Sequence, residues 1–184
     1  MSQLKVSSVT DLSGTGSTYA PGHVIQVVTA EKLDTFAATP GAVWADIPGL
    51  SVTITPQSAN SKMLILADIK AAGTQDNSVV RAKVVRGISG TFTDVGVGDA
   101  ASNRPRSLGQ FYISSGGGGI YYMAQIGGNI NDQPNTLSPV TYKAQIGGDS
   151  NATVVRVNIT QGDRDAAYQD ARGYSSITVM EIAQ

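Results

Sequence analysis

Residues 50–72, LSVTITPQSANSKMLILADIKAA, constrain the fold more than any other stretch of the chain. Within it, residues 51–55 alternate polar and apolar side chains, as in a strand that buries one face. Pro56 then ends this strand, because proline cannot donate a hydrogen bond to a neighbouring strand. Residues 63–66, MLIL, are apolar at both parities and predict a strand covered on both faces. A half-exposed strand followed by a covered one predicts a β-sandwich.

The composition limits the class of protein. The 184 residues suit one domain with a substantial core, and only 15% of them are charged. The absence of cysteine rules out disulfides, thiolate chemistry and Cys-ligated metals. The net charge of −1 gives no argument for binding nucleic acid or an anionic membrane. No apolar run approaches the roughly twenty residues that span a bilayer, and the N-terminus lacks the apolar core of a signal peptide. We therefore expect no membrane insertion and no nucleic acid partner.

Short alternating or apolar runs recur along the chain at the spacing expected of a sandwich or jelly roll. The predicted strands are residues 23–29, 51–55, 63–71, 79–86, 91–97, 108–113, 120–126, 140–146, 154–159 and 176–182. Pro48 and Gly49 should turn the chain into an opening hairpin. Helix is expected only as one turn within residues 31–36 and as a short segment at residues 165–172. The predicted fold class is all-β: an antiparallel, jelly-roll-like β-sandwich of about ten strands.

Residues 1–22 differ from the rest and predict an extended N-terminal arm on a sandwich domain of residues 23–184. The arm is rich in glycine and serine, and its candidate anchoring side chains are Leu4, Val6, Val9 and Leu12. Burying so little apolar surface on its own domain gives little beyond the entropy lost in ordering the arm. We therefore expect the arm to dock on another protein, with packing on its own domain as the alternative.

No set of residues forms a recognisable catalytic or metal-binding motif. His23 is the only histidine, no GxSxG motif accompanies it, and beside a Pro-Gly turn it is expected to be structural. Three carboxylates, Asp163, Asp165 and Asp170, surround Arg164. Their spacing does not match an EF-hand, so a solvated or ion-paired loop is expected rather than a calcium site. We expect neither enzymatic activity nor a cofactor.

Other residues are candidates for contacts with other molecules. The glycine run of residues 116–119 lacks the lysine of a phosphate-binding loop and predicts an exposed, adaptable tip. Tyr121 and Tyr122 follow it and, with Tyr112, form a tight group of tyrosines. Because aromatic faces stack on the apolar faces of sugars, we expect these three side chains to contact a host surface glycan. We expect a solvated strand face, rather than a basic binding patch, at Arg81, Lys83, Arg86, Arg104 and Arg106.

Several segments resemble bacteriophage virion proteins of a structural or tail-fibre-like type, common among phages of cyanobacteria and marine bacteria. They are IPGLSVTITPQSANSKMLI, DQPNTLSPVTYKAQI, a VxRVNIT strand and, most specifically, RGYSSITVMEIAQ after a loop rich in Asp and Tyr. The resemblance covers about residues 23–184, and SSGGGGIYYMAQIGGN has no counterpart in it. It implies a β-sandwich head that is usually a homotrimer on the particle exterior, and it names no catalytic residue.

The sequence therefore favours a non-enzymatic virion protein on the particle exterior, made in the host cytoplasm. The main hypothesis is a homotrimeric fibre component used in host attachment, with residues 154–159 or 176–182 near the trimer axis. Its partners would be further copies of itself, other virion proteins through the arm, and a host glycan. The alternatives are a capsid decoration protein that cements the head and, more distantly, a free carbohydrate-binding module.

Overall fold

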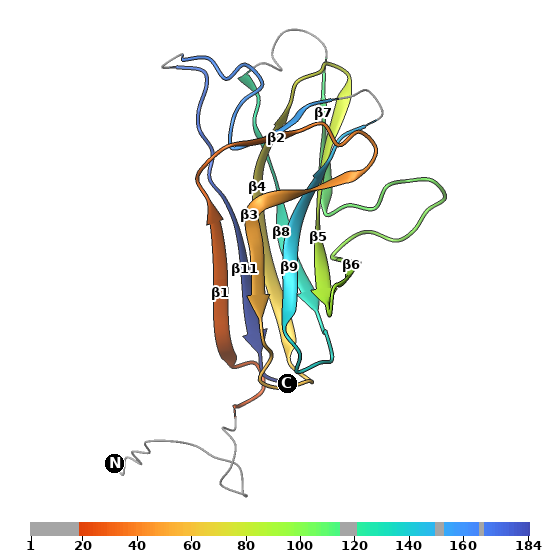
Figure 1. Ribbon diagram of the computed structural model, residues 1–184, viewed down its shortest axis with the longest axis vertical. Coiled ribbons are helices and arrows are strands. Elements are labelled where there is room, and N and C mark those ends of the chain that lie inside the picture. Colours follow the sequence, from red (N-terminus) through yellow and green to blue (C-terminus); the bar gives the residue numbers. More distant parts are fainter. Residues whose placement is uncertain (1–18, 115–120, 150–152, 166–167) are drawn as a thin grey trace, which may run out of the picture.

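The computed structural model of the chain describes residues 19–114, 121–149, 153–165 and 168–184. These residues form eleven strands in two antiparallel sheets, which confirms the predicted all-β class (Figure 1). The strands are β1 (Val24–Lys32), β2 (Phe36–Ala38), β3 (Trp44–Ile54), β4 (Lys62–Gly73), β5 (Ser78–Ile88), β6 (Thr91–Val95), β7 (Gly109–Ile113), β8 (Ala124–Asp132), β9 (Val140–Gly147), β10 (Val155–Val157) and β11 (Ser175–Ile182).

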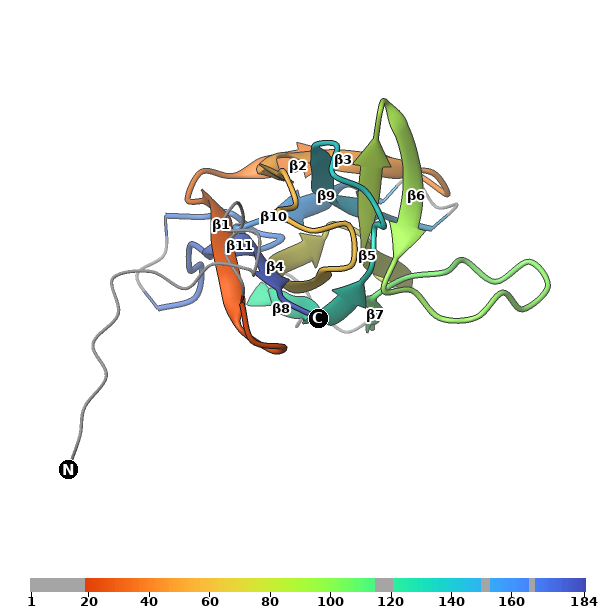
Figure 2. The same ribbon diagram turned by 90° about the horizontal axis from the view of Figure 1, so that it is seen from below.

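The strand order is that of a jelly roll. The first sheet runs β1-β11-β4-β8, with β10 beside the C-terminal part of β4 and β2 beside β10. The second sheet runs β3-β9-β5-β6. β6 pairs with the C-terminal half of β5, and β7 pairs with its N-terminal half. Strands that follow one another, such as β3 and β4 or β8 and β9, therefore lie in opposite sheets, as two Greek keys require. Figure 2 looks along the strands and shows the two sheets packed face to face.

The core lies between the two sheets and is built from the alternating residues that the sequence predicted. On β3, Val52 and Ile54 are buried and the polar residues beside them are exposed. On β4, Ile65 is fully buried and pairs with Val179 of β11 on one side and Ile130 of β8 on the other. Each of these three side chains belongs to a different strand of one sheet. They form a continuous apolar row against the second sheet.

The outward face of β4 differs from the prediction that this strand is covered on both sides. Leu64 and Leu66 alternate with the buried residues and are only half-buried on the outer face of the first sheet. A second sheet covers one face of β4, and among the described residues no third layer covers the other. The prediction is therefore wrong for the single chain on this face.

β3 is longer than predicted because the chain does not reverse at Pro48 and Gly49. Its pairing with β9 shifts register between Asp46 and Ser51, and Gly49 takes a φ of 86°, a conformation that favours glycine. The irregularity is a bulge within one strand. The predicted opening hairpin is also wrong, since β3 pairs with β9 whereas β4 pairs with β11 and β8. Because β3 pairs with the distant β9 on both sides of Pro48 and Gly49, the strand continues through a Pro-Gly pair that locally favours a turn.

The two helical expectations fail in the described residues. β1 continues to Lys32, which pairs with Ser175, and the short β2 follows where a helical turn was expected. Residues 165 and 168–172 of the expected helix are in a turn or irregular. β8 starts and ends later than predicted, and Gly127 continues the strand because pairing with β4 runs from Ala124 to Asp132. For β1 and β8, a ladder with a distant strand outweighs the local preference.

Candidate functional site at the loop end

The described parts of four connections meet at one end of the sandwich, which we call the loop end: residues 74–77, 114 and 121–123, 148–149 and 153–154, and 158–165 and 168–174. Backbone contacts join their described parts. The amide of Thr74 donates to the Val154 carbonyl over 3.1 Å, and the amide of Asn77 donates to the Ile113 carbonyl over 2.7 Å. The chain enters and leaves the sandwich at the opposite end, the terminal end (Figure 1).

The three candidate tyrosines all lie at the loop end and are exposed, but each makes a different contact. The Tyr112 hydroxyl, on β7, donates to Asn77 Oδ1 over 2.7 Å. The Tyr122 ring meets Phe111 edge-on, with 5.5 Å between ring centres. The Tyr121 ring lies 4.6 Å from the guanidinium carbon of Arg164. The structure therefore brings the tyrosines to one end of the molecule without stacking them into one aromatic platform.

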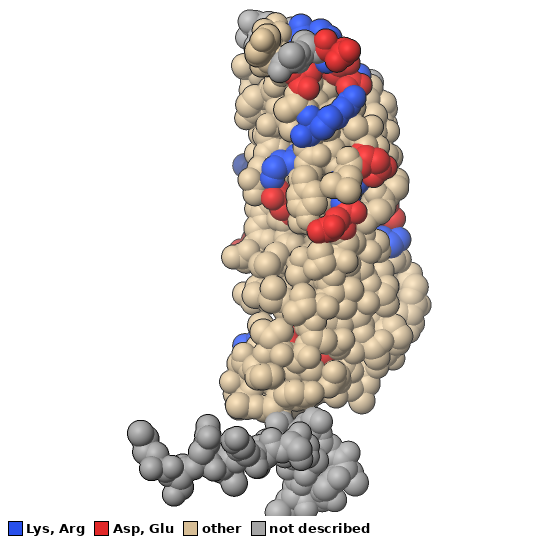
Figure 3. All heavy atoms as spheres, turned by 90° about the vertical axis from the view of Figure 1, so that its left-hand side faces the viewer, with Lys and Arg blue, Asp and Glu red and all other residues tan. Residues whose placement is uncertain are grey.

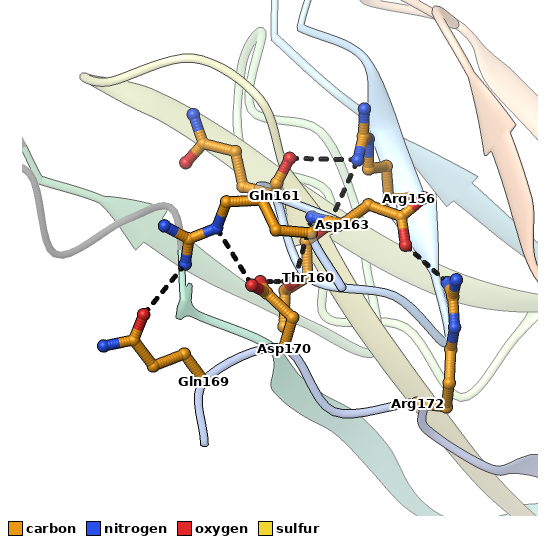
Figure 4. Close-up of polar contacts among 8 residues, drawn as sticks. Arg156, Thr160, Gln161, Asp163, Gln169, Asp170 and Arg172 are labelled. Carbon is orange, nitrogen blue, oxygen red and sulfur yellow. Dashed lines mark hydrogen bonds and ion pairs between the residues drawn. The ribbon is translucent and has the colours of Figure 1, made fainter. Parts of the chain in front are cut away.

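Arg164, whose guanidinium lies over the Tyr121 ring, makes polar contacts with two side chains of its own connection. Figure 4 labels these two partners, Gln169 and Asp170. The Nε of Arg164 lies 2.9 Å from Asp170 Oδ2, and its Nη2 donates to Gln169 Oε1 over 3.3 Å. The Thr160 hydroxyl donates to the other Asp170 oxygen over 2.5 Å. The hydrogen bond from Thr160 and the charge of Arg164 lower the pKa of Asp170 below its ordinary value. Arg164 thus links the exposed ring of Tyr121 to a carboxylate that stays ionised.

The same connection contains a second ion pair, so of the two expected alternatives, a solvated or an ion-paired loop, the structure has the ion-paired one. Arg172 Nη1 lies 2.7 Å from Asp163 Oδ1. Arg156 of β10 donates through Nη1 to the carbonyls of Thr160 and Gln161, over 3.2 and 2.9 Å (Figure 4). Within the described residues, no group of three or more histidine or acidic side chains is placed to hold a metal ion. The connection is a polar surface cross-linked by arginines.

The expected solvated face of cations is wrong for the residues on β5. Arg81 and Lys83 are buried, with 8% of each exposed. Arg81 donates to the Gly148 carbonyl, and burial lowers the pKa of its guanidinium, although Asp149 opposes the shift. Arg86 pairs with Asp132 over 2.7 Å. These cations are therefore packed against other residues. The alternation of polar and apolar residues along β5 indicates which side chains point outward, but not which residues cover them.

Two matching sets of residues on the outer face of the second sheet were not predicted, and we call them the lysine–aromatic sets. They are Trp44, Lys83 and Asp94, and Phe92, Lys143 and Asp46. In each set the lysine Nζ lies over the aromatic ring, 4.6 or 4.5 Å from its centre, and 2.6 or 3.0 Å from the carboxylate. The sequence signal is an aromatic-x-Asp triplet on β3 and another on β6. The lysines, carboxylates and aromatic rings of this face therefore contact one another.

His23 and the described end of the arm lie at the terminal end. The rings of Tyr19 and His23 are stacked with 5.3 Å between their centres, and the His23 carbonyl accepts from the amide of Ala183 over 2.9 Å. These contacts agree with a structural role for His23. The candidate anchoring residues lie outside the described residues: Leu4, Val6, Val9 and Leu12. None of the described segments is a helix with the length and apolar character needed to cross a bilayer.

The fold and these contacts define a jelly-roll β-sandwich with an ion-paired connection at its loop end. No protein-family model and no curated protein match the chain. Among solved structures, it is similar to a VP2 subviral particle of infectious bursal disease virus, with 14% identity and a TM-score of 0.43, over 91% of this chain and 42% of that one. It is also similar to the T13 particle of that virus, with 12% identity and a TM-score of 0.45, over 96% and 44%. The chain spans less than half of the length of these proteins.

Proposed function

We propose that this protein is a non-enzymatic structural component of a phage particle, exposed on the exterior as a homotrimeric fibre module. Its N-terminal arm would hold it to another virion protein, and its loop end would face outward and contact a host surface glycan. The sequence motifs that resemble phage virion proteins support this role. The observation that carries it in the structure is the separation of the two candidate contact regions.

The arm and the tyrosines are joined to opposite ends of the sandwich. The Gly22 amide donates to the Ala183 carbonyl over 2.8 Å, so the chain enters beside its own C-terminus. Residues 1–18 are covalently attached at this terminal end, through Tyr19. The twelve residues of β4 run from there to the loop end, a span of about 40 Å at roughly 3.3 Å per residue. A module held at one end therefore presents Tyr112, Tyr121 and Tyr122 far from its attachment.

Deletion of residues 1–18 tests the attachment half of the proposal. We expect a folded protein with an unchanged thermal transition, because the deletion leaves Tyr19 and its contacts in place. We also expect it to be lost from particles, since a partner groove could pair the arm as an added strand. The measurement is complementation of a phage that lacks the gene, followed by detection of the protein in purified particles. A matched control replaces residues 1–18 by a glycine-serine segment of equal length.

Recovery of the truncated protein at wild-type copy number would place the attachment in the sandwich instead. Imaging of the labelled protein on intact particles separates the two virion roles. Label at the tail supports the fibre module, whereas a regular array over the head would support a capsid decoration protein. Absence of the wild-type protein from particles would contradict both roles.

Replacement of Tyr121 and Tyr122 by alanine tests the recognition half of the proposal. We expect weaker adsorption of particles to host cells, because both exposed rings disappear. The thermal transition should move little, because surface side chains contribute about 0.5 kcal/mol or less and the contact with Arg164 about 0.5–1 kcal/mol. The control is Leu137→Ala, which removes an exposed apolar side chain from the β8–β9 connection. Unchanged adsorption by the double variant would contradict glycan binding at this site.

A further inference from the structure

The outer face of the first sheet carries an uncharged surface in which apolar side chains alternate with threonine and asparagine, and we call it the apolar face. Its two central rows, read from β1 through β11 and β4 to β8, are Val27, Met180, Leu64 and Asn131, and Thr29, Thr178, Leu66 and Asn129. Val24 and Ile182 extend it towards the terminal end. Charged side chains border it, with Lys62 at one end and Glu31 and Asp68 at the other.

The apolar face is not the surface that a solvated sheet needs. The outer face of an antiparallel sheet in water is ordinarily polar, yet 52% of Val27 and 43% of Val24 are exposed here. Figure 3 views the molecule from the β1 side and shows the charges gathered towards the loop end, with few over the half nearer the termini. By contrast, the outer face of the second sheet has the two lysine–aromatic sets, which leave its charges paired.

The sequence of β4 gives the second argument that the apolar face is covered. Residues 63–66 are apolar on both faces of the strand, as in strands buried on both sides. The described residues of a single chain fully bury only the inner face, with Met63 and Ile65. β11 shows the same excess, since Met180 and Ile182 alternate with the buried Ile177 and Val179. Both β4 and β11 therefore carry apolar residues on their outer as well as their inner faces, as expected of strands with a second layer packed on the outer side.

We propose that the apolar face packs against the same face of two further copies of this chain, around a three-fold axis parallel to the strands. This names the trimer interface of the proposed function and rests on that function. A partner must cover Val27, Leu64 and Met180 without bringing an unpaired charge to them. The face itself is such a surface, and closed symmetric assemblies bury equivalent patches of identical chains.

The width of the face suits three copies. Four strands at about 4.8 Å spacing give a face about 15 Å wide, and three such faces closed into a prism each stand about 4 Å from the axis. This is slightly less than half of the roughly 10 Å that separates packed sheets, so side chains from all three faces meet at the centre. β10 offers no comparable surface: Val155 and Val157 are fully buried, and Arg156 is held by its own loop.

The chain supplies a matched pair of positions for the test. Thr178 and Thr29 face each other across β11 and β1 on the apolar face, with 3.0 Å between their hydroxyl oxygens. Thr141 and Thr53 do the same across β9 and β3 on the outer face of the second sheet, at 2.8 Å. Thr178 and Thr141 are each half-buried and each has an exposed threonine partner. Thr178→Glu and Thr141→Glu therefore make the same chemical change on two opposite faces.

Sedimentation velocity of the full chain, with circular dichroism as a check of folding, gives the result. We expect the wild type and Thr141→Glu to sediment at three times 19.0 kDa and Thr178→Glu to fall to 19.0 kDa while folded. A trimer that survives Thr178→Glu would overturn this interface and leave the trimer itself intact. A wild type that is monomeric or dimeric would overturn the three-fold packing, whereas the presence of the protein on particles is tested separately.

A cysteine probe avoids dependence on a disruptive variant. The chain has no cysteine, so Thr178→Cys and Thr141→Cys each introduce a single reactive thiol. We expect a thiol reagent to label Thr178→Cys more slowly than Thr141→Cys in the native trimer and at the same rate in urea. Equal native rates would overturn the proposal. Slow labelling of Thr178→Cys in a monomer, relieved by deleting residues 1–18, would show that the chain's own arm covers the face and would also overturn it.

Discussion

Replacing Ile65 by alanine is expected to lower the free energy of unfolding by about 2–5 kcal/mol, as large-to-small changes in packed cores do. Ile65 is fully buried in the centre of β4, between Val179 and Ile130 in the adjoining strands. Removing its outer methyl groups leaves a cavity that three strands of one sheet cannot close together. Chemical denaturation at a fixed protein concentration measures the loss, because unfolding of an oligomer depends on concentration.

A graded series shows whether the cavity is the cause. Ile65→Val should cost about 0.5–1.5 kcal/mol, because only one methyl group is lost. Val43→Ala, at a side chain that is 67% exposed, should change the free energy of unfolding by less than about 0.5 kcal/mol. A loss for Ile65→Ala no larger than that of Val43→Ala would contradict the position of Ile65 in the core.

Replacing Glu181 by glutamine is expected to destabilise the terminal end and to remove a pH dependence. Glu181 is fully buried on β11, where its Oε2 accepts from Gln26 Nε2 over 2.5 Å. Its Oε1 accepts from the amides of Gln57 and Ser58 over 2.8 and 3.2 Å. Glutamine has one acceptor oxygen, so at least one donor loses its partner, at a cost of about 1–3 kcal/mol. One carboxylate thus ties together β11, β1 and the β3–β4 turn.

The pH dependence follows from the pKa of Glu181. Burial alone would raise this pKa, but the hydrogen bonds from Gln26, Gln57 and Ser58 outweigh it and hold the pKa below the ordinary glutamate value of 4.5. The carboxylate therefore stabilises the fold fully above pH 4.5, and this stabilisation is lost as the pH falls through the lower, folded-state pKa. Glu181→Gln should be less stable near neutral pH and should lose less stability on acidification.

Glu31→Gln is the matched control for this change. The Glu31 carboxylate accepts a hydrogen bond from the Tyr174 hydroxyl at the surface, over 2.8 Å. The same substitution there should change the free energy of unfolding by about 0.5 kcal/mol or less, with the acid dependence of the wild type retained. Equal effects of the two substitutions, measured by denaturation between pH 3 and pH 7, would contradict a special role for the buried carboxylate.

The sequence predicted that the three tyrosines are exposed, but not which residues their side chains contact. The three tyrosines do lie exposed at one end, next to the connection that contains Arg164. That Tyr121 lies beneath Arg164, whereas Tyr122 meets Phe111, could not be predicted, because residues 121 and 164 are joined only by the packing of separate connections. The aromatic-x-Asp triplets were visible in the sequence, but their lysines come from other strands.

The sequence by itself determined the all-β class, most strand positions and the inward residues of β3, β4 and β5, because period-two alternation is a local property of one strand. Tertiary structure decided whether Pro48 and Gly49 form a turn or a bulge, and which donors meet Glu181. It also decided that Arg81 and Lys83 are covered and that Leu64 and Leu66 are not fully so within one chain. These outcomes depend on register and packing between strands far apart in the sequence, and no single strand contains that information.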